Sequence, residues 1–365
     1  MIGPATLSDI WTMRRTPRSL VMLYNEAMLV HQHRWLWFTI RCLLEGNGRD
    51  GITLKYRERG MRAFAQSVGH NGRPEQDIVV LAAYGGGRGH PTDPDVWFRV
   101  MEALCIQAGH HHIQRLYARL SQGHEELREV FRQLGFNRYA HQTVLRLEGP
   151  DWDQGTTLAP MRPQSRRDIW AIHKLYGATT PRHAQLAEAR DSRSWMLPRM
   201  WQHTQRWRPY HRGWVLGGED NLTAYLHLTS GSDAHVLTLL LHPEIHDITT
   251  DILRFGLGQI SDAQPVYLLL RDYQRELLLP AGDLGFQPIG EQAMLFKQTT
   301  MAVRRPILAK VLESGLEPPV RVPTISPLEG DMRPYVRTTR YNQQHRPPSG
   351  GVTSTYSADS REWDR

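Results

Sequence analysis

The stretch from Asp77 to Phe136 constrains the fold of this chain more than any other part. A β-branched apolar run predicts a buried strand, and the glycine-rich segment after it predicts a loop. Apolar residues at helical spacing, an alternating run and a short helix that ends at Gly135 follow. The predicted order is strand, loop, helix, strand and helix, over residues 77–83, 84–94, 95–109, 113–120 and 124–136. Two strands joined by a crossover helix are expected to lie parallel in one sheet.

This order ends in Leu134-Gly135-Phe136, is followed by a further expected strand, and resembles the GNAT family of N-acyltransferases. In that family the loop after the central strand holds the pyrophosphate of acyl-CoA on free backbone amides at a helix N-terminus. The resemblance implies acetyl-CoA or another acyl-CoA as co-substrate. It also implies an amine of a small molecule or of a protein as the acceptor.

The pattern occurs twice. The phrase at Pro4 to Trp11, where Ser8 and Asp9 are expected to cap a helix, returns at Pro163 to Trp170, and the second copy also ends in Leu-Gly-Phe. A repeat of this length indicates duplication of a whole fold. We therefore expect an α/β (α+β) protein of two GNAT-like domains in tandem, each a mixed sheet flanked by helices. The expected boundaries are 1–148 for the first domain, 149–156 for a linker, 157–302 for the second domain and 303–365 for a disordered tail rich in Pro and Arg.

The loop after the first central strand holds the expected cofactor-binding residues, which are Gly85, Gly86, Gly87, Arg88 and Gly89. The glycines would let the backbone approach a phosphate, and Arg88 would pair with it. The matching loop of the second copy, 242–251, has no glycine and carries three carboxylates. The first domain is therefore the expected catalytic half. A glycine-rich turn that binds nothing is the alternative.

No catalytic residue is assigned from the sequence. The family often has a tyrosine five residues before the Phe of its Gly-Phe ending, where it protonates the leaving thiolate. That position is Phe131 in the first copy and Ala281 in the second, while Tyr117 and Tyr273 lie nearby without supporting spacing. Two functions stay open: transfer of an acyl group from acyl-CoA to an amine, or a duplicated domain without turnover that acts as a ligand-sensing or protein-interaction module.

The formal charge of +7 and the pI near 9.5 suit an anionic ligand such as CoA. They would also suit nucleic acid, but the arginines are scattered and many lie in the tail, so nucleic acid is not an expected partner. No apolar run of roughly 18 residues and no signal pattern occur. We expect a soluble, cytoplasmic protein without a membrane partner.

Other segments predict structure rather than chemistry. Cys42 and Cys105 are expected to be inert buried thiols, and the histidines of 109–113 are expected to form a solvated turn and not a metal site. The segment from Met22 to Leu44 is expected to be helical. Its aromatic residues Trp35, Trp37 and Phe38 are expected to pack in a core or between domains, with a ligand channel or a membrane face as alternatives.

Overall fold

The computed structural model describes residues 2–58, 61–70, 73–85, 94–149, 161–198 and 209–299. The predicted tail and nearly all of the predicted linker lie outside the described residues. Every described residue belongs to one compact unit, Met1–Arg304. Below, the first half means the described residues up to 149, and the second half means those from 161 onward.

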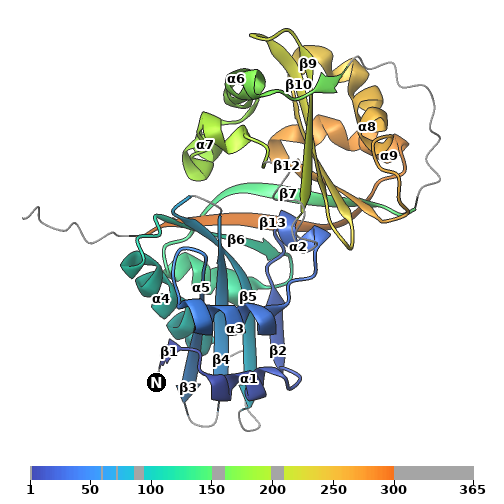
Figure 1. Ribbon diagram of the computed structural model, residues 1–365. Coiled ribbons are helices and arrows are strands. Elements are labelled where there is room, and N and C mark those ends of the chain that lie inside the picture. The colour runs from blue at the N-terminus through green and yellow to red at the C-terminus, as the bar shows by residue number, and fades with distance from the viewer. Residues whose placement is uncertain are drawn as a thin grey trace, which may run out of the picture. The chain divides into compact units, whose positions relative to one another are not determined.

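The first half opens with a short strand and helix and then builds the central strands (Figure 1). Its elements are β1 (Ile2–Pro4), α1 (Leu7–Met13), β2 (Ser19–Met22), α2 (Glu26–Val30), α3 (Trp35–Glu45), β3 (Gly51–Glu58), β4 (Met61–Gly69), β5 (Glu75–Gly85), α4 (Pro94–His110), β6 (Arg115–Ser121), α5 (Glu125–Gln133) and β7 (Asn137–Leu147). The strand, helix, strand and helix predicted from Asp77 onward are present as β5, α4, β6 and α5.

The second half repeats this order, except that its described residues include no strand that corresponds to β2. Its elements are β8 (Arg162–Pro163), η1 (Arg166–Asp168), α6 (Ile169–Thr179), α7 (Arg182–Glu188), η2 (Ser192–Trp195), β9 (Tyr210–Gly217), β10 (Leu222–Ser230), β11 (His235–Leu241), η4 (Pro243–Ile248), α8 (Thr249–Leu257), β12 (Val266–Arg271), η5 (Asp272–Leu277), α9 (Leu278–Asp283) and β13 (Gln287–Gln298). The predicted α/β class, with a mixed sheet flanked by helices, is confirmed. The domain boundaries stay predictions.

The strands of both halves form one continuous sheet of 13 strands. Its order is β1-β3-β4-β5-β6-β13-β7-β12-β11-β10-β9-β8, with β2 paired to β5 beside this path. The last strands are exchanged: β13 of the second half lies between β6 and β7, and β7 of the first half lies between β13 and β12 (Figure 1). Each half therefore completes the sheet of the other.

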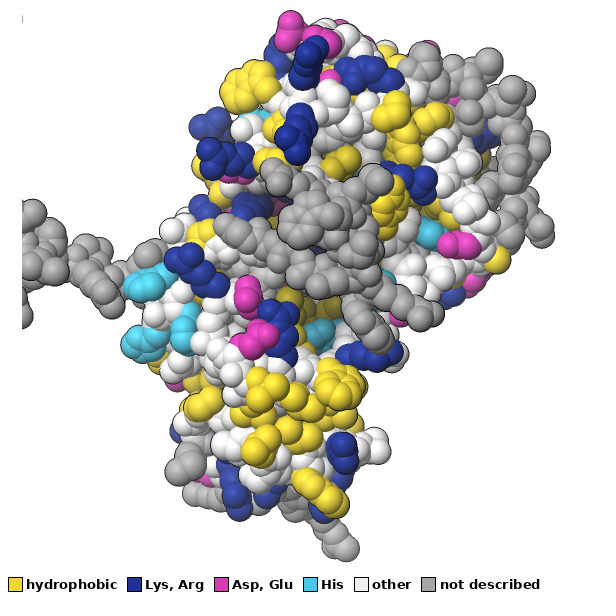
Figure 2. Space-filling view, in the orientation of Figure 1, with side chains coloured by type: hydrophobic (Ala, Val, Ile, Leu, Met, Phe, Trp, Pro, Cys, Tyr) yellow, Lys and Arg dark blue, Asp and Glu magenta, His cyan; other side chains and the backbone are white. Residues whose placement is uncertain are grey.

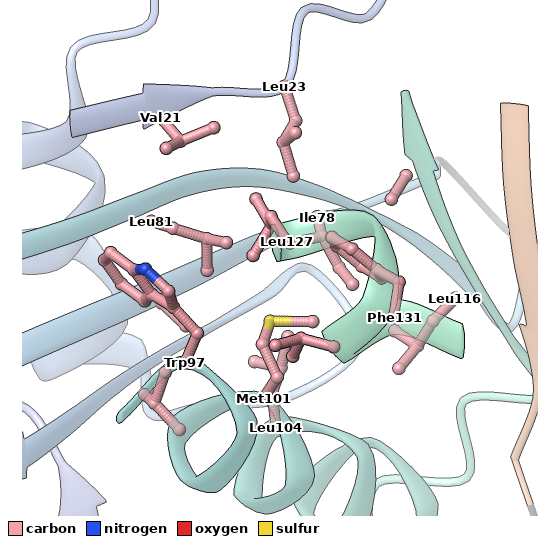
Figure 3. Close-up of a cluster of buried hydrophobic side chains, with 14 of the residues drawn as sticks. Val21, Leu23, Ile78, Leu81, Trp97, Met101, Leu104, Leu116, Leu127 and Phe131 are labelled. Carbon is pink, nitrogen blue, oxygen red and sulfur yellow. The ribbon is translucent and has the colours of Figure 1, made fainter. Parts of the chain in front are cut away.

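The exchange also joins the hydrophobic cores. The core of the first half packs α4 and α5 against the sheet, and it includes Ala293 and Leu295 from β13. Figure 3 shows part of this cluster, where Met101, Leu104, Leu127 and Phe131 converge. The core of the second half packs α8 and α9 in the same way and includes Leu145 from β7. Removing either last strand would open the core of the opposite half.

Both Leu-Gly-Phe endings form the same helix stop. Gly135 and Gly285 have φ values of +80° and +89°, which is the left-handed region that favours glycine. The amide of Phe136 donates to the carbonyl of Phe131 at 3.0 Å, and the amide of Phe286 donates to the carbonyl of Ala281 at 3.1 Å. This is the six-to-one bond of a Schellman motif. The repeat of Leu-Gly-Phe is thus explained by the backbone conformation that ends the helix in each copy.

The repeated phrase near the N-terminus is also a capping device. The first helix begins at Leu7 after Thr6, so the prediction that Ser8 and Asp9 precede it is wrong. Asp9 instead accepts a hydrogen bond from the Thr6 amide at 2.8 Å. In the second copy Asp168 accepts one from the Ser165 amide at 2.6 Å. An acid three residues into the helix satisfies the amide of the cap residue in both halves.

The prediction that the segment 22–44 is helical holds only in part. The segment contains the end of β2 and the two helices α2 and α3, which are separated by residues 31–34. Trp37 is 66% exposed, so the packing interpretation fails for this residue. Together with Leu7, Trp11 and Leu44 it belongs to the exposed apolar side chains of α1 and α3, where Figure 2 shows a hydrophobic patch.

Candidate functional site

Two gaps in the sheet mark the points where the parallel strands separate. Glu75–Asp77 of β5 pairs with Arg115–Tyr117 of β6, and the pairing then stops although β5 continues. In the second half, His235–Leu237 of β11 pairs with Val266–Leu268 of β12 and then stops in the same way. Beyond each paired segment, the central strand has a backbone edge with free hydrogen-bonding groups unless another group fills the gap.

The chain itself fills the gap of the first half. Strand β2, Ser19–Met22, pairs antiparallel with β5 beyond the point of separation. The amide of Leu23 extends this ladder by donating to the carbonyl of Val79 at 2.9 Å. Val21 and Leu23 also turn their side chains into the core (Figure 3). The edge of β5 is therefore used by the protein and is not open to a ligand.

Replacing Leu23, which is 1% exposed, tests whether β2 is a fixed part of the core. Leu23→Ala is expected to lower the free energy of unfolding by about 2–5 kcal/mol, because it removes a buried side chain and leaves a cavity. Leu20→Ala is the matched control on the same strand, since Leu20 is 44% exposed, and it should change stability by no more than about 0.5 kcal/mol. Urea unfolding measures both. Equal small losses would mean that β2 is only loosely attached.

The gap of the second half opens onto a cavity of about 320 Å³. Within the described ranges no strand pairs with β11 beyond Leu237 on the β12 side. There the side-chain Nε2 of Gln274 donates to the carbonyl of Leu239 at 2.7 Å. The cavity is lined from β10, β11 and β12 and from the segments around α6, α7 and η2. Its polar and aromatic lining includes Glu26, Tyr176, Glu188, Arg190, Trp195, Tyr225, His227, Arg271 and Tyr273.

One wall of the cavity carries a triad of two arginines around a carboxylate. Glu188 lies 3.1 Å from Arg190, 3.7 Å from Arg271 and 3.1 Å from the hydroxyl of Tyr176, which donates to it. Burial would raise the pKa of Glu188, but the two arginines hold it below its ordinary value. The Arg190 guanidinium also lies over the ring of Trp195, at 5.1 Å from the centroid. The triad carries two positive charges and one negative charge.

A second carboxylate faces the same cavity from the first half. Glu26 is the first residue of α2, and among the described residues it has no hydrogen-bond or ion-pair partner in direct contact. Burial would raise its pKa, but the electrostatic effect of Arg119, Arg190 and Arg271 lowers it, so Glu26 is ionised at neutral pH. The cavity thus presents a second negative charge that is not in direct contact with the positive triad.

Two histidines, His211 and His227, line the cavity, and His227 is neutral. Burial, together with the neighbouring His211, lowers the pKa of His227 to about 3. The two imidazoles stack with their centroids 5.3 Å apart. His227 therefore adds an aromatic surface rather than a charge, beside the rings of Tyr225 and Trp195.

The structure gives different surroundings to Tyr117 and Tyr273, the two tyrosines to which the sequence assigned no role. The hydroxyl of Tyr117 is buried and donates to the carbonyl of Ala187 at 3.0 Å, which anchors α7 to the first half. Tyr273 lines the cavity at the start of η5. The positions where the family often has its tyrosine, Phe131 and Ala281, lie in the two cores. Of the two tyrosines that the sequence left open, Tyr273 is therefore the one that lines this cavity, together with Tyr176 and Tyr225.

Of the predicted cofactor-binding residues, Gly85 is described. It ends β5 with a φ of +73°, a conformation that favours glycine. Gly86, Gly87, Arg88 and Gly89 lie outside the described residues, so their role as a phosphate loop stays a prediction. In the second half the matching turn is η4, where the His242 imidazole lies 3.5 Å from the carboxylate of Glu244.

The cysteines, the histidines and the helices were also given predictions from the sequence. Both cysteines are free and half-buried, and burial raises the pKa of the Cys105 thiol to about 12, which suits an inert thiol. In the part of the chain that the structure describes, no cluster of three or more His, Cys, Asp or Glu side chains is arranged to bind a metal ion. None of the described helices is long and apolar enough to span a membrane.

Among known proteins, no family model and no curated protein matches this chain. Solved structures that are similar include a tandem GNAT protein from the clavulanic acid biosynthesis pathway, with 14% identity, 78% of this chain and 100% of that chain covered, and a TM-score of 0.42. A GCN5-related N-acetyltransferase from Sphaerobacter thermophilus has 10% identity, covers 84% of this chain and 97% of its own, and has a TM-score of 0.44. A conserved protein of unknown function from Staphylococcus epidermidis has 13% identity, 67% and 94% coverage, and a TM-score of 0.44. At these values the likeness carries no argument about substrate or activity.

Proposed function

We propose that the protein is an N-acyltransferase that moves an acyl group from acyl-CoA to an amine, and that the second half is the active half. The observation that supports this proposal most is the difference between the two gaps in the sheet. The gap of the first half is filled by β2, whereas the gap of the second half opens onto a charged cavity. This assignment departs from the sequence-based expectation, which favoured the first half for its glycine-rich loop.

The residues of the second half fit the pantetheine arm of acyl-CoA better than they fit its diphosphate. Beyond Leu237 the edge of β11 is not paired with a described strand, although the Gln274 side chain occupies the carbonyl of Leu239, and this edge can offer backbone groups to the amides of an extended pantetheine arm, in the manner of an added strand. The turn after β11 carries Glu244 and Asp247, and these charges would oppose a diphosphate bound there. We therefore expect the pantetheine arm to supply most of the affinity for acyl-CoA.

When bound, acyl-CoA would supply the thioester whose carbonyl carbon the amine attacks. Glu26, as an ionised carboxylate, can accept a proton from the ammonium form of the acceptor. Tyr273 can donate a proton to the departing thiolate and be reprotonated by solvent. The C–N bond forms as the C–S bond breaks, and the products are an amide, the free thiol and one proton. No oxidant or reductant is required.

Calorimetric titration of acetyl-CoA into three proteins tests which half binds the donor. Thr238→Trp fills the cavity from β11 and is expected to weaken binding at least tenfold, because the bulky ring occupies the space beside the open edge. Arg88→Ala, in the glycine-rich loop, is expected to bind as the wild type does. The melting temperature of Thr238→Trp serves as the folding control. The opposite pattern would place the donor in the first half, and the absence of binding to all three would overturn the proposal.

A ligand-sensing module without turnover is the second candidate. It is favoured by the buried Phe131 and Ala281 at the positions where the family often has a proton donor, and by the carboxylates of η4. Release of free thiol from acetyl-CoA in the presence of amines distinguishes the two functions. Thiol release that requires an amine supports the transferase, while binding without release supports the sensing module.

A further inference from the structure

We infer that the cavity of the second half takes a zwitterionic ligand, an amine that also carries a carboxylate on an apolar or aromatic body. This inference rests on the proposed function in treating that ligand as the acyl acceptor. It does not depend on acyl transfer for its test, since the ligand is expected to bind without a donor.

The first argument is the separation of charge in the lining. Arg190 and Arg271 share Glu188, so the triad carries a net charge of +1. Glu26 carries a charge of −1 and is not in direct contact with the triad or with another described cation. The described carboxylates and arginines of the lining therefore sum to zero, with the charge of Glu26 apart from that of the triad. Such a lining is complementary to a ligand that carries both charges.

The second argument is the cost of leaving Glu26 without a partner among the residues that the structure describes. A half-buried carboxylate has lost part of its hydration, and the three arginines that keep it ionised do not contact it directly. An ammonium group that reaches Glu26 would form a charge-assisted hydrogen bond in a partly desolvated place. This arrangement also puts the amine at the residue that is expected to take its proton.

The third argument concerns the anionic end and the body of the ligand. A carboxylate next to Arg190 or Arg271 would neutralise the excess positive charge of the triad. An amine without a carboxylate would leave this charge unmatched. Beside these charged groups, the rings of Trp195, Tyr225 and His227 line the cavity and favour an apolar or aromatic body over a polar one.

Three probes that share a phenylethyl body test the inference by calorimetry in the absence of any acyl donor. They are phenylalanine, which is zwitterionic, 2-phenylethylamine, which has only the amine, and 3-phenylpropionate, which has only the carboxylate. Phenylalanine is expected to bind at least tenfold more tightly than either of the others, because each charged contact contributes about a factor of ten. Equal binding of phenylalanine and 2-phenylethylamine, or no binding of any probe, would overturn the inference.

A variant pair locates the amine. Glu26→Gln keeps the shape of the side chain and is expected to weaken phenylalanine and 2-phenylethylamine about tenfold, while 3-phenylpropionate binds as before or better. Glu125→Gln is the matched control, because Glu125 also opens a helix but is exposed, pairs with Arg128 and does not line the cavity. Equal loss for all three probes would point to a structural effect and count against the inference. Zwitterion binding without any acetyl-CoA binding would overturn the proposed transferase and leave the ligand class standing.

Discussion

A fragment that ends at Gly149 is expected to remain unfolded when it is produced alone, although it carries every predicted element of the first half. In the intact protein, the edge of β6 pairs with β13 over Arg115–Ser121, and β13 closes the core with Ala293 and Leu295. Without β13, the fragment exposes both a strand edge and its core. The complementary fragment from Pro150 to Arg304 lacks β7 and has the same defect at β12.

Mixing the two fragments is expected to restore the fold as a one-to-one complex, because each supplies the strand that the other lacks. Circular dichroism and size-exclusion chromatography measure the folding and the stoichiometry. The control is the intact chain cut after folding at the same position, which should remain associated. If the first fragment folds alone as a stable monomer, with β7 taking the place of β13 beside β6, the exchange is not required for folding.

The fold class was predictable because its signals are local. Alternating and helical periodicities mark β5, α4 and β6 in the sequence, and the glycine after each Leu marks where α5 and α9 stop. The exchange was not predictable. β7 and β13 are the last strands of their halves. The alternation of apolar and polar residues in each strand fits the sheet of its own half as well as the sheet of the other half. Only long-range pairing decides between these arrangements.

The missed strand β2 shows a different limit. Ser19–Met22 is only four residues long and precedes a segment whose apolar spacing looks helical, so no local signal marks it as a strand. Its structure comes from β5, whose open edge provides the pairing. The same missed strand changes the functional interpretation, because it fills the gap beside β5 in the half that the sequence favoured for its glycine-rich loop.

The cavity residues were not predicted for a related reason. Glu26, Glu188 and Arg271 are far apart in sequence and each has an ordinary local role, at a helix start, a helix end or a strand end. Arg271 does stand out as a charge that closes the apolar strand β12, and such a residue at the end of a central strand is a usable signal. Their chemistry arises only when the sheet brings the two halves together.

A second large loss of stability is expected from replacing Asp77, which ends the segment of β5 that pairs with β6. Its carboxylate accepts a hydrogen bond from Asn25 at 2.8 Å and lies 3.1 Å from His70 and 3.3 Å from Arg119. Burial would raise the pKa of Asp77, but Arg119 and His70 hold it well below its ordinary value. Asp77→Asn is expected to cost about 3–5 kcal/mol, because it removes the charge of a buried carboxylate that pairs with the largely buried Arg119 and leaves His70 with Glu75 alone. Asp50→Asn, at an exposed acid, is the control and should cost no more than about 0.5 kcal/mol.

The same contact predicts how stability depends on pH. Burial alone would lower the pKa of His70, but Asp77 and Glu75 raise it from 6.5 to about 9. Because the folded state binds this proton more tightly than the unfolded state, the stabilisation by His70 is complete below pH 6.5 and is lost as the pH rises to about 9. The lowered pKa of Asp77 has the opposite sign, so its contribution is lost only in acid, below the ordinary pKa of an aspartate.

Urea unfolding at several pH values between 6 and 9.5 tests this sign with the variant His70→Gln. Other groups titrate in this range, so the informative quantity is the difference in unfolding free energy between wild type and variant. That difference is expected to be largest near pH 6 and to shrink toward pH 9, because the variant has no proton to lose at this position. His110→Gln, at an exposed histidine, should show no such trend. A difference that stays constant across the range would mean that His70 is not held protonated by Asp77 and Glu75, and the pairing of charges at this end of β5 would then need another explanation.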